Sequence, residues 1–288
     1  MSRPLRRRRS VLYVPAANAR AMAKAATLAC DAVIYDLEDA VAPEAKADAR
    51  SSLIEHFGEA AHGLAQERII RVNAESGVPV AEDIKAAARC RPDAVLLPKL
   101  ERVGTLLAAR QALDSLGGAG IRLWAMVETP LGIVNLRELA EAGAADSVGL
   151  DCLVAGVNDL AKETNLPLPA GRPTIEHWLA LIVIHARAFG MDTLDGVYND
   201  FHDEEGFAAE CRKGSLGGFD GKTLIHPGQI AAANAAFAPA EEELIEARAV
   251  VAAFEDPANS GQGVLVVNGK MVERLHADIA RRLIIKSM

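Results

Sequence analysis

Short apolar runs alternate with helix-like segments along most of this chain. Regular alternation of this kind is typical of a parallel sheet whose faces are covered by helices. We therefore expect an α/β protein folded as a (β/α)8 TIM barrel. The eight apolar runs that we interpret as strands are residues 10–15, 32–37, 68–72, 94–97, 123–127, 148–157, 193–198 and 221–225.

A doubly wound open sheet is the alternative arrangement of the same units. It is less favoured, because no GxGxxG motif follows any of the runs. The composition suits buried parallel strands, since half of the 288 residues are hydrophobic and only 4% are aromatic. We expect residues 1–227 to form the barrel. Residues 228–288 then form a C-terminal helical extension, as a lid over the barrel mouth or an oligomerisation arm.

The charge and the cysteines restrict the function classes. A net charge of −8 argues against a nucleic-acid partner. We find no apolar run of membrane-spanning length and no signal-peptide core after the arginines at 6–9. We interpret these arginines as a solvated N-terminus, with help in binding a phosphate-bearing ligand as the alternative. Four scattered cysteines without a CxxC pair indicate reduced thiols of a cytoplasmic protein and disfavour a zinc site.

Two carboxylates follow neighbouring apolar runs. Glu128 directly follows the fifth run, and the sixth run leads to Asp159. The ends of parallel strands meet at one edge of the sheet or barrel, which is where α/β proteins bind ligands. Carboxylate oxygens are ligands for hard cations, so we predict a magnesium site formed by this pair. The alternative is that each carboxylate only caps the helix after it.

Arg71 lies inside the apolar third run, between Ile70 and Val72. A buried charge must be paired or must bind an anion. A guanidinium can hold a substrate carboxylate through two parallel hydrogen bonds. A structural ion pair with Glu38 or Asp39 is an alternative that is compatible with this role.

Asp36, Glu38 and Asp39 form an acidic cluster at the end of the second run. Like charges repel unless a cation offsets them. The cluster either contacts metal-bound water or is a solvated loop, and for Asp36 alone we favour the solvated loop. Lys99, at the end of the fourth run, forms a Schiff base if it is buried with a depressed pKa. The interpretation that we favour is that Lys99 balances the acidic cluster.

The backbone of Gly156, Val157 and Asn158 precedes Asp159 and offers N–H groups to the carboxylate of a 2-oxo acid. A glycine allows a ligand to approach the backbone closely. His202 and His226 are isolated, without HxH or HExxH spacing, so neither is assigned to a metal. The sequence contains no GxSxG elbow and no GxxxxGK[ST] loop, which disfavours a serine hydrolase and a P-loop NTPase.

Motifs along nearly the whole chain carry a family resemblance. In its motifs and their order the chain resembles the citrate lyase beta subunit and malyl-CoA lyase group of magnesium-dependent CoA-ester lyases, within the HpcH/HpaI aldolase superfamily. The matching segments are RSVLYVPA (9–16), AVIYDLEDAVAPEAKADAR (32–50), RVNA (71–74), LLPK (96–99), VETPLGI (127–133), AGVNDLAKE (155–163), LDGVYNDFHDEEGF (194–207), GFDGKTLIHPGQI (218–230) and NGKMVERLH (268–276).

The resemblance implies a (β/α)8 barrel with a C-terminal extension, assembled as a homotrimer or hexamer. It implies that Glu128 and Asp159 ligate Mg²⁺ and that Arg71 binds the keto-acid carboxylate. It also implies that Glu38 and Asp39 lie near metal-bound water.

The tail departs from the pattern of the family. Malyl- and citramalyl-CoA lyases of this group carry a catalytic Asp in an M-[IV]-D segment that reaches the site of a neighbouring subunit. Here the segment is Met271-Val272-Glu273, in which the carboxyl group is kept and one methylene is added. We therefore expect either that Glu273 keeps the acid/base role with a shifted geometry or that the enzyme serves another substrate.

The predicted function is the magnesium-dependent cleavage of a 3-hydroxy-3-carboxyacyl-CoA thioester to a 2-oxo acid and acetyl-CoA. Citryl-, malyl- and citramalyl-CoA all fit the pattern, and no feature marks an acyl-carrier partner. One alternative is a metal-dependent aldolase that acts on free hydroxy-keto acids. A second alternative is a non-catalytic binding homologue.

Overall fold

The computed structural model describes residues 6–59, 66–75 and 78–287. Contacts divide the chain into two compact units. The larger unit is Arg9–Ala236, and the smaller unit comprises the chain from Phe237 onward with the residues before Arg9.

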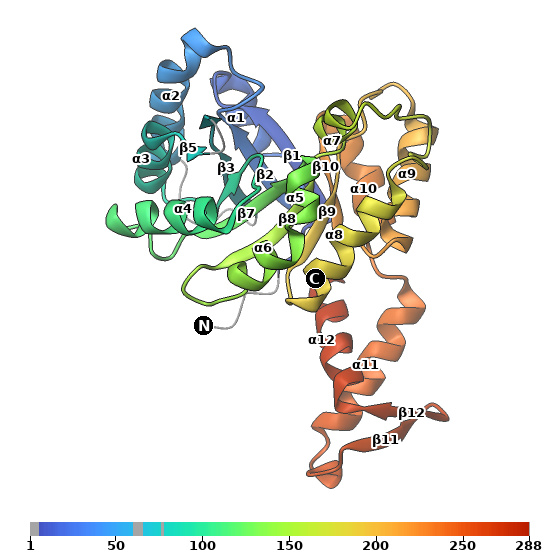
Figure 1. Cartoon of the computed structure of the whole chain (residues 1–288). Helices are drawn as coiled ribbons and strands as arrows, with labels where there is room; N and C mark the ends of the chain where they lie inside the picture. The colour runs from blue at the N-terminus through green and yellow to red at the C-terminus, as the bar shows by residue number, and fades with distance from the viewer. Residues whose placement is uncertain (1–5, 60–65, 76–77, 288) are drawn as a thin grey trace. The chain divides into compact units, whose positions relative to one another are not determined.

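The larger unit is a closed parallel barrel surrounded by helices, which confirms the (β/α)8 prediction (Figure 1). Among the described residues its strand order is β1-β10-β9-β8-β7-β6-β3-β2. Each strand coincides with a predicted run and differs from it only at its ends. The strands are β1 (Ser10–Pro15), β2 (Ala32–Asp36), β3 (Glu67–Arg71), β6 (Ala94–Leu97), β7 (Arg122–Val127), β8 (Leu150–Ala155), β9 (Asp192–Asp195) and β10 (Gly221–Leu224).

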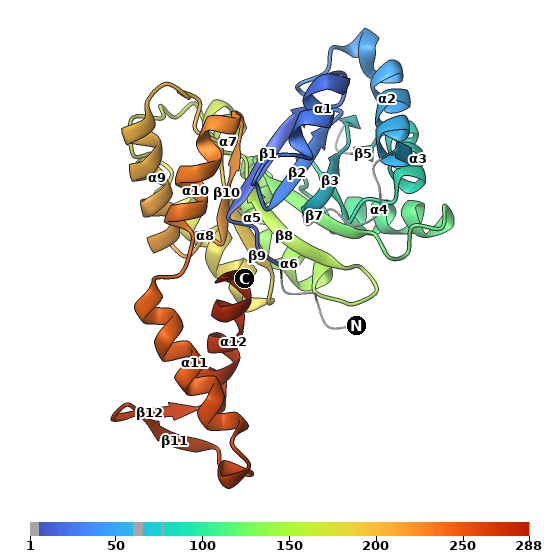
Figure 2. The ribbon, with the colours of Figure 1, turned by 180° about the vertical axis from the view of Figure 1, so that it is seen from behind.

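Helices follow the strands and cover the outside of the barrel (Figures 1 and 2). Several start at polar N-caps, such as Thr129, whose side chain accepts a hydrogen bond from the Gly132 N–H. A short hairpin of β4 (Ala74–Glu75) and β5 (Val78–Pro79) was not predicted. The helices of this unit are α1 (Ala19–Ala25), α2 (Lys46–Glu59), α3 (Ala81–Cys90), α4 (Val103–Ser115), α5 (Pro130–Val134), α6 (Leu136–Gly143), α7 (Val157–Glu163), α8 (Glu176–Ala188), α9 (Glu204–Leu216) and α10 (Ile230–Ala236).

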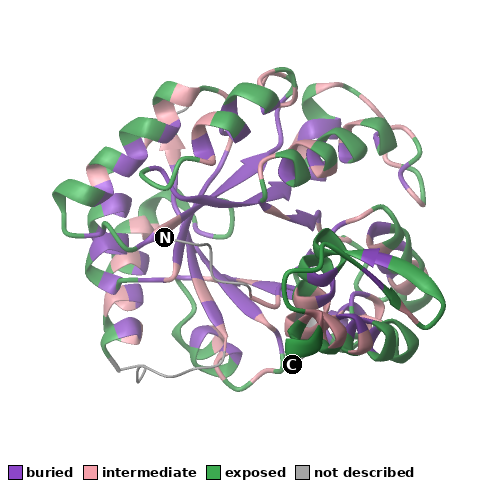
Figure 3. Ribbon diagram, turned by 90° about the horizontal axis from the view of Figure 1, so that it is seen from below, coloured by how far each residue is buried: buried purple, intermediate pink, exposed green. Residues whose placement is uncertain are grey.

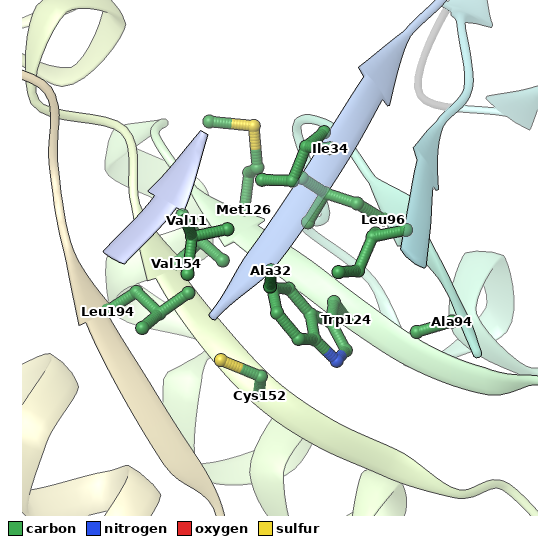
Figure 4. Close-up of a cluster of buried hydrophobic side chains, with 11 residues drawn as sticks. Val11, Ala32, Ile34, Ala94, Leu96, Trp124, Met126, Cys152, Val154 and Leu194 are labelled. Atoms are coloured by element: carbon green, nitrogen blue, oxygen red, sulfur yellow. The ribbon is translucent and has the colours of Figure 1, made fainter. Parts of the chain in front are cut away.

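The interior of the barrel is a packed hydrophobic core (Figure 4). Side chains alternate across a strand, so every second residue points inward. Trp124 is the largest of these inward side chains and is fully buried. The strands are buried along most of their length, whereas the surrounding helices also carry exposed residues (Figure 3). The other core residues are Val11, Ala32, Ile34, Ile69, Ala94, Leu96, Met126, Cys152, Val154 and Leu194.

A buried network of four charges links β9, β10, α9 and the segment after α7. Lys222 Nζ lies 2.8 Å from Asp195 Oδ2 and 2.7 Å from Glu210 Oε1. Arg172 donates to both carboxylate oxygens of Asp195, at 2.9 Å each, and its Nε lies 2.9 Å from Glu210 Oε2. Two cations thus balance two carboxylates in a region that almost no solvent reaches. Removing any one side chain leaves one buried charge without a compensating charge.

The smaller unit contains α11 (Glu241–Glu255), the hairpin of β11 (Val264–Val267) and β12 (Lys270–Glu273), and α12 (Arg274–Ser287). The hairpin turns at Asn268 and Gly269, both with left-handed φ, as the Asn-Gly pair predicts. Leu265 and Val272 of the hairpin pack with residues of both helices in one core. Among the described residues of the whole chain, no helix has both the length and the hydropathy needed to cross a membrane.

The boundary between the two units lies later than the predicted start of the extension at residue 228. Helix α10 (Ile230–Ala236) packs against α9, β1 and β10, and its Asn234 accepts a hydrogen bond from Ser10 Oγ at 2.7 Å. This helix therefore belongs to the barrel. The smaller unit begins with Phe237.

The buried network leads to a stability prediction. Lys222→Met leaves Asp195 and Glu210 sharing one cation in a buried environment, and it should lower the free energy of unfolding by about 3–5 kcal/mol. Lys85→Met removes an exposed pair with Glu82 and should cost less than about 1 kcal/mol. Urea denaturation of both variants measures the difference. Equal effects in the two variants would contradict the structural role of the network.

Candidate active site

A pocket of about 320 Å³ lies at the carboxyl ends of the barrel strands. Its walls include Arg71, Glu128 and Asp159, which come from three segments far apart in the sequence. Tyr13 and Asn199 also line it. The pocket therefore occupies the position where barrel enzymes bind their substrates.

Arg71 is anchored by Asp36 at the ends of two neighbouring strands. The two residues are register partners on β2 and β3, which places their side chains next to each other. Arg71 Nε donates to Asp36 Oδ1 at 2.7 Å, and Nη2 donates to Oδ2 at 2.6 Å. Burial lowers the pKa of Arg71, but the hydrogen bonds to Asp36 and the nearby acidic groups together outweigh burial and hold the pKa well above its ordinary value.

The prediction that Asp36 belongs to a solvated loop is wrong. Asp36 is 1% exposed. In addition to Arg71, it accepts hydrogen bonds from the backbone N–H groups of Glu38 at 2.9 Å and Ala40 at 3.1 Å. These bonds fix the turn after β2, because one carboxylate holds two backbone N–H groups of that turn. They also take the place of the hydrogen bonds that an exposed carboxylate would make to water. The error arose because strand register was not available from the acidic pattern alone.

Glu38 and Asp39 both reach the third nitrogen of the guanidinium. Arg71 Nη1 lies 2.9 Å from Glu38 Oε2 and 3.4 Å from Asp39 Oδ2. The first contact is an ion pair without hydrogen-bonding alignment, so Glu38 Oε2 is buried with no hydrogen-bond donor. Burial raises the pKa of Glu38, and Arg71 partly offsets that rise. The predicted ion pairing of Arg71 with these acids is confirmed.

Glu128 is a carboxylate with little access to water. It is 3% exposed, and its Oε1 accepts a hydrogen bond from the Lys99 backbone N–H at 2.7 Å. Burial raises the pKa of Glu128 to about 8, a rise that the hydrogen bond from Lys99 opposes. Gly156 makes room for this side chain, since a Cβ at Gly156 would lie 2.6 Å from Glu128 Oε2.

Asp159 lies in the first turn of α7, because β8 ends at Ala155, earlier than the predicted sixth run. The N-cap of α7 is Gly156, and the N-cap of α5 is Thr129. Neither Asp159 nor Glu128 is therefore a capping residue, and the capping alternative is wrong for both. Asp159 is partly exposed and faces the same pocket as Glu128.

Lys99 joins the acidic groups of the site. Its Nζ lies 3.6 Å from Glu38 Oε1 and 3.7 Å from Asp159 Oδ2. Burial lowers the pKa of Lys99, but Glu38, Asp159 and Glu128 outweigh burial and raise it. A Schiff-base lysine needs a depressed pKa, so that alternative is not supported. The charge-balancing interpretation agrees with the ion pairs.

Not all of the backbone N–H groups before Asp159 are available to a substrate, as the prediction requires. The Gly156 N–H donates to the Val127 carbonyl at 3.0 Å, so it is not available to a substrate carboxylate. Val157 and Asn158 begin α7, where backbone N–H groups have no acceptor within the helix. The Asn158 and Asn199 amides exchange two hydrogen bonds, of 3.1 and 2.9 Å, at the pocket wall.

Tyr13, Met126 and Asn199 also line the pocket, although none of them was predicted as a site residue. The ring of Tyr13 lies under the guanidinium of Arg71, with 4.9 Å from Cζ to the ring centroid. Its hydroxyl lies 3.7 Å from Met126 Sδ. Inward alternation along β1 and β7 was the available signal for Tyr13 and Met126. Asn199 lies in a loop, where no periodicity applies.

The donor set of the pocket fits a divalent cation. Within the part of the chain that the structure describes, five carboxylates of the site face two cations, Arg71 and Lys99, so the ionised site has an excess of negative charge. The carboxylates are those of Asp36, Glu38, Asp39, Glu128 and Asp159. The buried Glu38 Oε2 also lacks a donor. Among the described residues, no three His, Cys, Asp or Glu side chains converge as a metal cluster. The predicted pair of Glu128 and Asp159 would therefore leave further positions of an octahedral cation to water and substrate.

Two other predicted features are not among the residues that line this pocket. Glu273 is the last residue of β12 in the smaller unit and is exposed, and its N–H donates to His276 Nδ1 at 2.9 Å. Its acid/base role stays a prediction. Arg9, expected to be solvated, instead forms two side-chain hydrogen bonds to Asp31, at 2.8 and 2.9 Å.

Comparison with known proteins agrees with the fold. The chain is 44% identical over 279 residues to a (3S)-malyl-CoA thioesterase of Cereibacter sphaeroides, an alignment that covers 97% of this chain and 94% of the relative. It is 34% identical over 287 residues to the citrate lyase subunit beta of Escherichia coli K12. This alignment covers 97% of this chain and 93% of that relative.

A solved structure is similar over almost the whole chain. It is the CitE protein of Mycobacterium tuberculosis in complex with magnesium, acetoacetate and coenzyme A. The TM-score is 0.71 and the identity 31%, with coverage of 96% of this chain and 97% of that one. Residues 9–227 match the model of the HpcH/HpaI aldolase/citrate lyase family. The chain belongs to the HpcH/HpaI aldolase/citrate lyase family.

Proposed function

We propose that this chain is a magnesium-dependent carbon–carbon lyase that cleaves a 3-hydroxy-3-carboxyacyl-CoA thioester to a 2-oxo acid and acetyl-CoA. The observation that carries the proposal is the convergence of Glu128, Asp159 and Arg71 on one pocket. Two relatives named for malyl-CoA and citrate chemistry support the substrate class. The magnesium and coenzyme A of the similar CitE structure support the cofactor and the thioester.

The charged residues of the site have separate roles in this proposal. Glu128 and Asp159 would hold magnesium, which supplies Lewis-acid polarisation of the substrate oxygen at the reacting carbon. Asp36 occupies Nε and Nη2 of Arg71, so the guanidinium presents Nη1 to the substrate carboxylate. Glu38 and Asp39 already contact Nη1 and would exchange this contact for water. The N–H groups at the start of α7 would complete the binding of the carboxylate.

The proposed reaction moves two protons and one electron pair. The substrate hydroxyl loses its proton to water in the pocket and becomes the carbonyl of the 2-oxo acid. The carbon–carbon bond breaks, and its electron pair moves to the thioester fragment as an enolate. A general acid then protonates the enolate carbon to give acetyl-CoA. We assign this last step to Glu273, which would come from a neighbouring copy in a homotrimer or hexamer.

Thioester hydrolysis is the second candidate, because the 44% identical relative is named a thioesterase. In that reaction water attacks the thioester carbonyl, and the products are a free hydroxy acid and the CoA thiol. The same carboxylates and Arg71 would bind the acid end of the substrate. The two reactions release different products from one substrate, so a single assay separates them.

Incubation with (3S)-malyl-CoA and magnesium should release glyoxylate and acetyl-CoA without a stoichiometric rise in free thiol. Glyoxylate is measured as a phenylhydrazone and thiol with a chromogenic disulfide, with and without EDTA. Citramalyl- and citryl-CoA are assayed in parallel through pyruvate and oxaloacetate. Thiol release without a 2-oxo acid would overturn the lyase in favour of the hydrolase. Saturable binding without any product would identify a binding homologue.

The matched variants for this assay are Glu128→Gln and Glu138→Gln. The first removes a proposed cation ligand and should lower kcat/KM by at least about 10²-fold, in keeping with the loss of a cation that stabilises developing charge. Glu138 is exposed on α6, so its variant should retain activity. Undiminished magnesium-dependent turnover by Glu128→Gln would contradict the metal assignment.

The proton on Glu128 leads to a pH prediction. Its folded-state pKa of about 8 lies above its ordinary value of 4.5, so between these values the native state keeps a proton that the unfolded state loses. Wild-type stability should therefore fall relative to Glu128→Gln as pH rises, by more than about 1 kcal/mol between about pH 5 and pH 8.5.

Urea denaturation in EDTA at the two pH values measures this difference. Magnesium should restore wild-type stability at the higher pH, because cation binding displaces the proton. It should have little effect on the variant. A constant stability difference across the two pH values would contradict the raised pKa.

Glu273 is tested by substitution and by mixing. Glu273→Gln should lower kcat by about 10²–10⁴-fold, the usual contribution of general acid–base catalysis, whereas Glu273→Asp should keep most of it. If the carboxyl group comes from a neighbouring copy, mixed assemblies of Glu128→Gln and Glu273→Gln should regain activity that neither variant has alone. Full activity of Glu273→Gln would remove this residue from the mechanism.

A further inference from the structure

We propose that Lys99 is a built-in competitor for the divalent cation of this site. Its ammonium group holds Glu38 and Asp159 together until a cation displaces it, so the affinity of the site for the cation is set by exchange with the lysine. This inference rests on the magnesium site of the proposed function and deepens it.

A single residue connects three carboxylates of the pocket. The Lys99 side chain reaches Glu38 and Asp159, with Nζ 3.6 and 3.7 Å from their nearest oxygens. Its backbone N–H donates to Glu128 at 2.7 Å. Lys99 thus contacts both proposed cation ligands, Glu128 through the main chain and Asp159 through the side chain.

The backbone of Lys99 is held in a costly conformation. Its φ is +46°, a left-handed value that a glycine would adopt without strain. This conformation follows Pro98 and aims the Lys99 N–H at Glu128. A glycine would supply the same N–H, so the N–H alone does not account for a lysine here. The ammonium group is the further feature that this position provides.

The two cationic side chains of the site differ in mobility. Arg71 is 8% exposed and is fixed by two hydrogen bonds to Asp36, so it stays in place. The Lys99 side chain is 39% exposed, and its ion pairs exceed hydrogen-bonding distance. A flexible stem with a point charge can move into solvent at little cost. A divalent cation at Asp159 would repel the nearby ammonium and displace it.

Binding of Mn²⁺ in the absence of substrate tests the proposal. Isothermal titration of the full chain should show that Lys99→Met binds Mn²⁺ at least about fivefold more tightly than the wild type, because the competing charge is gone. Lys99→Arg, which keeps the charge, should not show this gain. Lys162→Met is the control, since it removes a charge from the last turn of α7, three residues after Asp159, and should change affinity by less than about twofold.

The gain of Lys99→Met should persist at moderate salt, because displacement at contact distance is poorly screened. Unchanged or weaker Mn²⁺ binding by Lys99→Met would overturn the proposal, as would an equal gain in Lys162→Met. Failure of the metal site itself gives a different result. In that case the wild type binds no Mn²⁺ saturably, or Glu128→Gln binds it as tightly as the wild type does.

Discussion

Arg71 and Asp36 form a two-point ion pair at the carboxyl ends of β2 and β3, and the arrangement of the pocket depends on it. Strand register places the two residues side by side. Asp36 also fixes the turn that carries Glu38. One buried pair therefore orients a guanidinium and positions the neighbouring acids. Its loss would leave a charge in a site that excludes most water.

The same exclusion of water bears on the proposed cation site. Glu128 is too buried to ionise at its ordinary pKa, and Asp159 shares a lysine with Glu38. A divalent cation would relieve both conditions, by expelling the proton of Glu128 and taking the place of the Lys99 ammonium. Cation binding, proton release and movement of the lysine would then be coupled events in one pocket.

The barrel was predictable because short apolar runs such as residues 94–97 alternate regularly with helix-like segments along the chain. The ends of the strands were less predictable. Helix α7 begins at Val157, for example, although the sequence there is still as apolar as the strand before it. The burial of Asp36 depends on its register with Arg71, and register involves residues far apart in sequence. The contacts of Lys99 depend on a positive φ that only tertiary packing imposes on a lysine.

The most direct test of the account is a crystal structure with Mn²⁺ and a 2-oxo acid bound, with anomalous scattering used to locate the metal. The account predicts one peak in the pocket, about 2.0–2.3 Å from carboxylate oxygens of both Glu128 and Asp159. It also predicts that the acid binds both the metal and Arg71. A peak that one of the two carboxylates does not ligate, or an acid bound away from Arg71, would contradict it.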